Sequence, residues 1–194
     1  MTDRLPPLVA SAQQRAIEAG FTLACEPGVG RLLATLAAAV PLHGRILEMG
    51  TGVGVGTAWI VHGLGERRDV EVISVEVDPG TAAVARTGTW PPWLSLRVAD
   101  ILDLLTDLGS FDLIFADSQG GKWAGLDRTI AALRPCGILL VDDMTPPTWL
   151  DDQHRHNTAR VRETLLGHAD LIAAEIAAAS GMILATRRID QLKT

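Results

Sequence analysis

The sequence of 194 residues contains no tyrosine and only two lysines, Lys122 and Lys193, and its formal net charge is −6. Its basic residues are scattered in twos and threes, without the basic stripe by which nucleic-acid-binding proteins neutralise phosphates. No uncharged apolar run reaches the roughly 18 residues needed to cross a bilayer, and no basic segment followed by an apolar one is visible at the start. We therefore expect no nucleic-acid partner, no membrane insertion and no export.

Cysteine is equally scarce. Cys25 and Cys136 form neither a CxxC motif nor a zinc-ligand spacing, so we expect reduced thiols in a cytoplasmic protein, both packed as small core residues. The sequence also has no internal repeat, low-complexity tract or linker. Because domains commonly contain roughly 100–200 residues, we predict a single domain over 1–194, with N-terminal helices over 1–40 and an α/β core over 45–188.

From Arg45 onward, short apolar runs rich in β-branched residues alternate with helical stretches. This alternation predicts βαβ units and a parallel sheet that is buried on both faces. The last two runs are separated only by Ser180-Gly181, which predicts an antiparallel hairpin, although the alanines of 171–179 also suit a helix. The expected fold class is α/β, a doubly wound, seven-stranded and mostly parallel sheet with a C-terminal antiparallel hairpin. Its strands are expected near 45–50, 70–77, 94–100, 111–117, 137–143, 171–179 and 182–188.

Residues 45–57, RILEMGTGVGVGT, place a glycine-rich turn between the first strand and a helix. Glycine suits turns with positive φ and the close approach of a ligand, and a helix N-terminus offers free N–H groups. The spacing fails the GxGxxG dinucleotide pattern from each possible start, and no GxxxxGK[ST] phosphate loop occurs. The remaining ExGxGxG pattern, with Glu48 at the strand end, resembles motif I of class I S-adenosylmethionine-dependent methyltransferases.

Acidic residues end the next two strands. Glu76 lies about 20 residues beyond the glycines, where a carboxylate can accept both ribose hydroxyls of a cofactor, although taken alone it would suit a solvated strand end. Asp100 follows the third strand, where methyltransferases of this class often hold the adenine amino group; a helix N-cap before Ile101 is an equal alternative. The glycine turn and Glu76 together favour a cofactor that contains a nucleoside.

Three further carboxylates, Asp117, Asp142 and Asp143, follow the fourth and fifth strands. At one edge of a sheet they would repel one another and raise each other's pKa values. A hard divalent cation such as Mg²⁺ or Ca²⁺ would relieve this repulsion, because such ions take oxygen ligands. The alternative is that the three acids stay hydrated at an open strand edge.

In combination, these patterns resemble the catechol and caffeoyl-CoA O-methyltransferase family over roughly residues 20–188. The matching segments are FDLIFAD at the fourth strand, LRPCGILLVDD at the fifth, where Cys136 replaces a family glycine, and SGMILATRR at the end. The resemblance implies a Rossmann-like methyltransferase fold, S-adenosylmethionine as cofactor and a small-molecule acceptor. It is also compatible with a homodimer, because the family often dimerises.

The resemblance also implies roles for individual residues. Glu48 and the Gly50–Gly56 turn would hold the methionine portion of the cofactor, Glu76 the ribose and Asp100 the adenine, with Asp117 between cofactor and acceptor. The family's metal site falls on Asp117, Asp142 and Asp143. The full expected cofactor site comprises Glu48, Gly50, Thr51, Gly52, Gly54, Thr57, Glu76, Val77, Asp100 and Asp117.

The sequence departs from the family at two further positions. Asp143 stands where the family has asparagine, which is compatible with a metal site of three carboxylates and also with a site without metal. The family's lysine, assigned to the deprotonation of the acceptor hydroxyl, is Gly120 here, and Lys122 lies two residues further on. Lys122 is therefore a candidate general base, with a solvated loop lysine as the favoured alternative. We expect the stretch 151–156, which contains two histidines, to be a solvated approach to a helix rather than a metal cluster.

The expected function is methyl transfer from S-adenosylmethionine to a hydroxyl of a small molecule, with Asp117 and Lys122 as catalytic residues. Mg²⁺ or another divalent cation would assist if the three carboxylates bind it. A metal-independent N-methyltransferase and a non-catalytic module that binds S-adenosylmethionine are alternatives on the same fold, because the fold alone does not determine the reaction.

Overall fold

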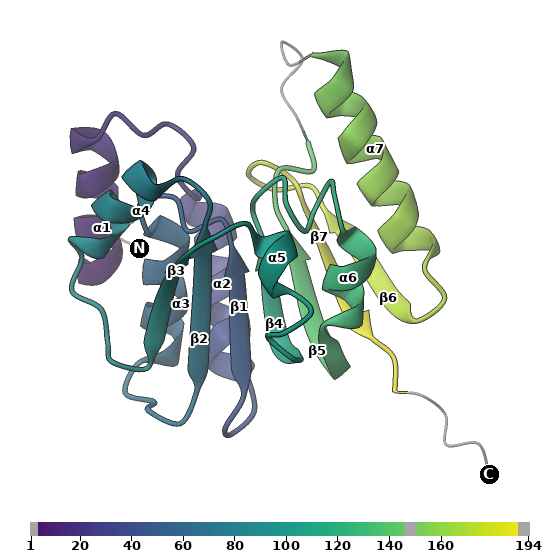
Figure 1. The fold of residues 1–194 in the computed structure, drawn as a ribbon, viewed down its shortest axis with the longest axis horizontal. Helices are drawn as coiled ribbons and strands as arrows, with labels where there is room; N and C mark the ends of the chain where they lie inside the picture. Colours follow the sequence, from purple (N-terminus) through teal and green to yellow (C-terminus); the bar gives the residue numbers. More distant parts are fainter. Residues whose placement is uncertain (1–3, 146–150, 190–194) are drawn as a thin grey trace.

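The computed structural model describes residues 4–145 and 151–189, which form a seven-stranded sheet between two layers of helices (Figure 1). The strands lie in the order β3-β2-β1-β4-β5-β7-β6, and the predicted α/β fold class is confirmed. The strands are β1 (Arg45–Met49), β2 (Glu71–Glu76), β3 (Leu94–Val98), β4 (Phe111–Ala116), β5 (Leu133–Val141), β6 (Leu171–Ile176) and β7 (Met182–Arg187). The helices are α1 (Pro7–Glu18), α2 (Pro27–Ala39), α3 (Val55–Leu64), α4 (Pro79–Arg86), α5 (Ile101–Leu104), α6 (Leu126–Ala131) and α7 (Asp152–Gly167).

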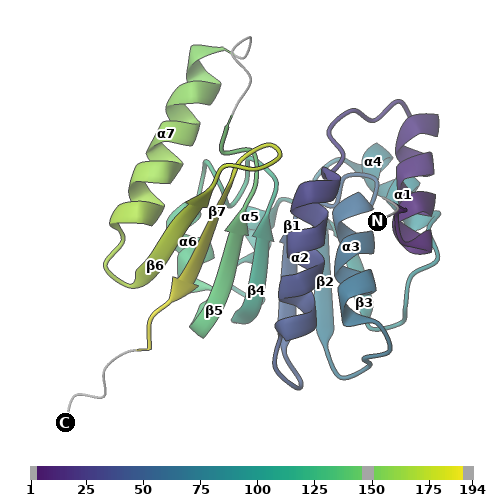
Figure 2. The ribbon, with the colours of Figure 1, turned by 180° about the vertical axis from the view of Figure 1, so that it is seen from behind.

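Successive side chains of the central strands enter two separate apolar clusters. Ile46 and Leu113 belong to the cluster that contains α1, α2 and α3, whereas Leu47 and Ile114 belong to the cluster that contains α5, α6 and α7. Helices α2 and α3 lie in front of the sheet in Figure 2, and α5 and α6 lie in front of it in Figure 1. Because both faces are buried, these strands need apolar residues at most positions, which explains their near-continuous hydrophobic runs.

The strand order reverses at the centre of the sheet, between β1 and β4. Both neighbours of β1 run parallel to it, and Met49 pairs with Ala116 at the last position of the β1–β4 ladder. Beyond this point the Asp117 amide still donates to the Met49 carbonyl, and the Gly50 amide donates to Val75 of β2. Ligands of doubly wound sheets bind outside the carboxyl ends of the strands at such a reversal, so this edge is where a cofactor is expected.

The C-terminal hairpin is present, but its loop is longer than the sequence suggested. β6 and β7 are antiparallel, and β7 is also antiparallel to β5. The connection covers residues 177–181 instead of Ser180-Gly181 alone, because Ala179 and Gly181 adopt positive φ and turn the chain away from the ladder. The carbonyls of Ser180 and Gly181 accept hydrogen bonds from Thr145 and Met144, so the loop is tied to the segment that follows β5.

The expected burial of both cysteines is corrected for one of them. Cys25 is buried as expected, but Cys136 is exposed with a φ of 63°, in the part of β5 where the register with β4 shifts between Phe111 and Leu113. This left-handed conformation favours glycine, the residue that Cys136 replaces.

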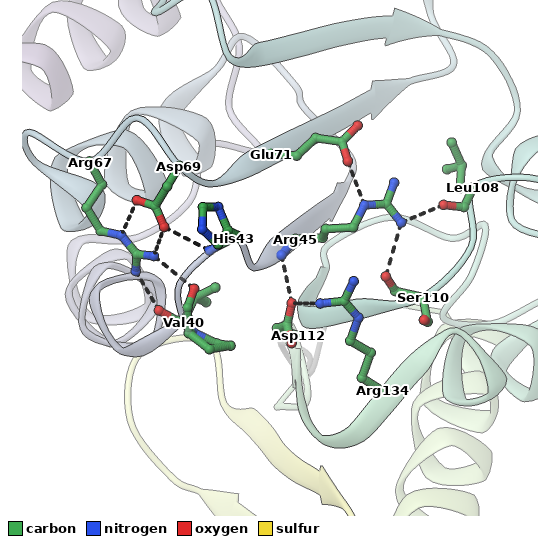
Figure 3. Close-up of polar contacts among 11 residues, drawn as sticks. Val40, His43, Arg45, Arg67, Asp69, Glu71, Leu108, Ser110, Asp112 and Arg134 are labelled. Atoms are coloured by element: carbon green, nitrogen blue, oxygen red, sulfur yellow. Dashed lines mark hydrogen bonds and ion pairs between the residues drawn. The ribbon is translucent and has the colours of Figure 1, made fainter.

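A network of charged residues ties together the amino ends of the central strands, opposite the reversal edge (Figure 3). The Arg45 guanidinium donates to the Leu108 and Ser110 carbonyls at 2.7 and 3.1 Å and pairs with Glu71 at 2.6 Å. The Asp112 carboxylate accepts from the Arg45 amide at 2.7 Å and from Arg134 at 2.6 Å. The charged residues at this edge therefore satisfy backbone groups and fix the strand ends.

In the part of the chain that the structure describes, no helix is both long enough and apolar enough to span a membrane.

We predict that Arg45→Met lowers the free energy of unfolding by about 1–3 kcal/mol, because it leaves two partly buried carbonyls without their charged donor. Urea denaturation followed by circular dichroism measures the change. The control is Arg68→Met, because the Arg68 side chain is 58% exposed and surface substitutions usually change stability by less than about 0.5 kcal/mol. Equal stability of the two variants would contradict the prediction.

Candidate active site

A cavity of about 840 Å³ opens at the reversal edge of the sheet, within the usual range of roughly 300–1,000 Å³ for small-molecule sites. Its walls come from the loop after α1, the glycine turn after β1, the end of β2, the segments after β4 and β5, the start of α7 and the hairpin loop. Among the residues expected in the site, those that line the cavity are Gly50, Thr51, Gly52, Glu76, Val77, Asp117, Lys122, Asp142 and Asp143. Glu48, Gly54, Thr57 and Asp100 lie outside this lining.

The glycine turn needs glycine for two physical reasons. Gly50, Gly52 and Gly54 have φ values of 99°, 54° and 91°, which side chains rarely tolerate. A Cβ atom on Gly50 would also lie 2.4 Å from the Asp117 carbonyl oxygen. The turn therefore brings the end of β1 against the end of β4 and presents its backbone to the cavity.

Glu76 fixes this turn from the end of β2. One carboxylate oxygen accepts from the Gly52 amide at 2.9 Å, and the other accepts from the Asp78 amide at 3.0 Å. The Asp78 side chain itself caps α4 by accepting from the Thr81 amide. Because each carboxylate oxygen can accept more than one hydrogen bond, Glu76 still has acceptor capacity toward the cavity.

Glu48 lies behind the turn and is fully buried. Its Oε2 accepts from the Thr57 and Ser74 hydroxyls, both at 2.5 Å, and Ser74 also shares a hydrogen bond with Thr51 at 2.6 Å. Its Oε1 has no hydrogen-bond partner among the described residues. Burial raises the pKa of Glu48 to about 7, against the opposing effect of the two hydroxyl donors. In this arrangement Glu48 anchors the start of α3 and β2 beneath the cavity wall.

Asp100 caps the short helix α5, with its carboxylate accepting from the Leu102 amide at 2.9 Å. This is the N-cap role that the sequence offered as an alternative to adenine binding, and the two roles are compatible.

Asp117, Asp142 and Asp143 line the same end of the cavity. Asp142 is 3% exposed, and its Oδ1 accepts from the Ser180 hydroxyl and from the Asp143 amide. Burial is the main cause that raises the pKa of Asp142 to about 6. Burial also raises the pKa of Asp117 well above its ordinary value, the Asp142 charge adds to this effect, and the Lys122 charge opposes it.

Lys122 is not a solvated loop lysine, because it is only 4% exposed. Its Nζ donates to the Asp142 carbonyl at 3.2 Å and lies 3.8 Å from the Asp143 carboxylate. The preceding Gly121 has a φ of 80°, and its carbonyl accepts from the Thr129 hydroxyl. This local turn folds the segment after β4 inward and delivers Lys122 to the acidic end of the cavity.

The carboxylates do not fit a shared divalent cation. Within residues 4–145 and 151–189, no group of three or more His, Cys, Asp or Glu residues is arranged to hold a metal ion. The Asp142 carboxylate is oriented by protein donors, and Asp143 faces the Lys122 ammonium. An ammonium group beside these carboxylates satisfies by itself part of the charge that a metal would neutralise.

The structure adds residues that the sequence did not single out. The His154 ring from the first turn of α7 lines the cavity and packs edge-on against Trp123, with ring centroids 4.6 Å apart. Cys25 and Ser180 also line it, and burial followed by the charge of Asp117 raises the pKa of the Cys25 thiol. The N-cap Asp151 was the available signal for His154, because it sets where α7 begins and hence which of its residues face inward.

This fold and cavity define a Rossmann-like methyltransferase. Residues 47–144 match the family model described as a methyltransferase domain, which is half of the chain, so the chain belongs to that family. The resemblance to class I S-adenosylmethionine-dependent methyltransferases is thereby confirmed.

Individual proteins support the family assignment. A protein of Mycolicibacterium vanbaalenii, named as a candidate O-methyltransferase, is 31% identical over 143 residues, which is 69% of this chain and 61% of that protein. The chain therefore spans less than two thirds of this relative. Cofactor-bound Rv0187 from MTB is a solved structure with a TM-score of 0.83 and 26% identity, and the match covers 96% of this chain and 92% of that one. The O-methyltransferase TomG from Streptomyces achromogenes, solved in complex with SAM (S-adenosylmethionine), has a TM-score of 0.78 at 22% identity with the same coverage.

We predict that Glu48→Gln makes stability less dependent on pH. Between the ordinary value of 4.5 and the raised pKa of about 7, folded Glu48 holds a proton that the unfolded chain has released. Stability therefore falls as pH rises through this window, by up to about 3 kcal/mol. The glutamine variant should lose this component while its side-chain oxygen still accepts from Thr57 and Ser74.

Urea denaturation of both proteins at about pH 5 and about pH 8 measures the difference, because this interval brackets the titration of Glu48. Asp117 and Asp142 also have raised pKa values, but they are present in both proteins and cancel in the comparison. An identical loss of stability in both proteins would contradict the prediction.

Proposed function

We propose that this protein is an S-adenosylmethionine-dependent O-methyltransferase that acts on a small-molecule hydroxyl. The observation that carries the proposal is a single cavity with two different ends. One end is lined by the glycine turn with Glu76 beside it, and the other is lined by three carboxylates and the buried Lys122. The family membership and the relatives named as O-methyltransferases support this reading.

The cofactor is proposed to lie along the glycine turn. The backbone of Gly50–Gly56 would face the methionine portion, and the remaining acceptor capacity of Glu76 suits the two ribose hydroxyls. Val77, whose side chain is largely exposed at the cavity wall, would pack against the nucleoside. Asp100 stays a prediction for the adenine amino group.

The acceptor is proposed to lie beside Asp117, Lys122, Trp123 and His154. In the reaction, the acceptor oxygen forms a bond with the methyl carbon while the carbon–sulfur bond breaks and its electron pair returns to sulfur. This displacement needs an in-line approach, so positioning by the cavity walls supplies much of the catalysis. No step is assigned to a metal, because the carboxylates do not fit one.

The acceptor hydroxyl must lose a proton, and His154 is proposed as the base. Histidine is the side chain used most often for this task. Lys122 was the candidate from the sequence, but its Nζ is engaged with the Asp142 carbonyl and the Asp143 carboxylate. A base must offer a free lone pair, which an ammonium in an ion pair lacks.

The remaining expectations concern the protein's surroundings. A small-molecule acceptor suits a cavity of about 840 Å³, and the acidic balance argues against a nucleic acid. A cytoplasmic location and a homodimer stay predictions.

We predict that calorimetry detects binding of S-adenosylhomocysteine to the wild-type protein and that Glu76→Ala weakens it at least about tenfold, equivalent to about 1.4 kcal/mol. The substitution removes the ribose acceptor and also the group that holds the Gly52 amide. Glu66→Ala is the control, because the Glu66 side chain is fully exposed. Absence of binding to the wild type, or equal binding by all three proteins, would refute the proposed cofactor site.

We predict that His154→Gln lowers the rate of methyl transfer by about 100-fold or more, the usual contribution of a general base. The assay follows labelled methyl transfer to a panel of small phenols, catechols and hydroxy acids. Binding of S-adenosylhomocysteine should not change. His156→Gln is a matched control, since His156 is exposed two residues further along α7. If both variants retain the wild-type rate, the base is another residue.

A further inference from the structure

We propose that the Lys122 ammonium takes the place of a divalent cation at the acidic end of the cavity. The positive charge of this site is then supplied by a side chain instead of a bound metal ion. The inference deepens the proposed function and rests on it. It assigns Lys122 to positioning the carboxylates and to binding the acceptor oxygen as a cation, instead of to proton removal.

The burial of Lys122 is the first argument. It is the only lysine within residues 4–145 and 151–189, and its side chain is 5% exposed. A buried ammonium is costly unless it is paired and hydrogen-bonded. Here the Asp142 carbonyl and the Asp143 carboxylate provide its partners at 3.2 and 3.8 Å.

The local backbone is the second argument, because it places a side chain at position 122 and excludes one at position 120. A Cβ on Gly120 would lie 2.9 Å from a methyl carbon of Ile101. A Cβ on Gly121 would lie 2.6 Å from the Met49 sulfur, and Gly121 also has positive φ. Two consecutive glycines thus form a tight turn in front of Lys122, whose side chain lines the cavity.

The orientation of the acids is the third argument. The Asp142 Oδ1 already accepts from the Ser180 hydroxyl and the Asp143 amide, so protein groups set its direction. Asp143 in turn directs its carboxylate at Lys122. In this set of contacts, the Lys122 ammonium is the positive charge that faces the carboxylates.

The ammonium can also contact the acceptor. Lys122 has three donor protons, of which the Asp142 carbonyl takes one and Asp143 lies toward another. The third is available to an acceptor oxygen beside Asp117. Deprotonation by the base leaves negative charge on that oxygen, and the ammonium stabilises the charge until the methyl group is bonded; Lys122 itself loses no proton.

Mn²⁺ is the probe for the test. The electron paramagnetic resonance signal of unbound Mn²⁺ measures the concentration of free ion. The wild-type protein and Lys122→Arg, which keeps a permanent cation, should leave equimolar Mn²⁺ free. Lys122→Gln removes the positive charge that faces the carboxylates. This variant should bind one Mn²⁺ per chain, and its Tm should rise when Mn²⁺ is added. Arg68→Gln, which removes an exposed positive charge elsewhere, should behave as the wild type.

The inference is overturned if the wild type binds stoichiometric Mn²⁺ and Asp117→Asn abolishes that binding. It is also overturned if the Lys122→Gln protein folds but binds no more Mn²⁺ than the wild type does. If Lys122→Gln fails to fold, the decision rests on the wild type and on Lys122→Arg. Retained methyl transfer by Lys122→Arg supports a cationic role, whereas loss of transfer by more than about 100-fold with intact folding indicates a proton-transfer role and overturns it. Calorimetry with S-adenosylhomocysteine on the same samples separates this result from failure of the proposed function.

Discussion

The contact between the ends of β1 and β4 is the constraint on which the rest of the site depends. The Gly50 backbone lies so close to Asp117 that any side chain at position 50 would overlap the Asp117 carbonyl. The Asp117 amide is at the same time held by the Met49 carbonyl. This close contact thus fixes the position of the glycine turn relative to Asp117. In-line methyl transfer requires such fixed positions of the groups around cofactor and acceptor.

Two groups of charged residues lie at opposite edges of the sheet. At the amino ends of the strands, Arg45, Asp112 and Arg134 pair with each other's backbone and side chains, and their role is to hold the strands. At the carboxyl ends, burial raises the pKa values of Glu48, Asp117 and Asp142. Burial of carboxylates is unfavourable and does not stabilise the fold. The concentration of such carboxylates at one edge of the sheet therefore marks that edge as the functional side.

The sequence was sufficient for features that follow from repeating patterns. Continuous apolar runs predicted a sheet covered on both faces, and the glycine spacing predicted where the chain needs positive φ. Glu76 was found because the end of a second strand must lie beside the end of the first in such a sheet. The strands and the acidic residues at the cavity edge could therefore be predicted from local sequence patterns.

Other features depend on turns whose direction no pattern specifies. Lys122 was expected in solvent because a polar loop residue usually is, but Gly121 turns it inward. His154 was placed on an exposed approach, and its orientation depends on where Asp151 caps α7. The hairpin loop was expected to be short, yet it extends to bring Ser180 to Asp142. In each case a single backbone conformation decides which side chains meet.

Asp143 shows how such a backbone constraint limits the chemistry. Its φ of 58° is left-handed, a region that few residues other than glycine, asparagine and aspartate occupy readily. Asparagine and aspartate fit the same backbone, so the choice between them changes charge without changing shape. With asparagine, Lys122 would face one carboxylate fewer; with aspartate, it gains the ion pair seen at 3.8 Å. The half-exposed carboxylate at position 143 and the buried lysine at position 122 therefore act as one electrostatic unit, in which the carboxylate makes the burial of the ammonium tolerable.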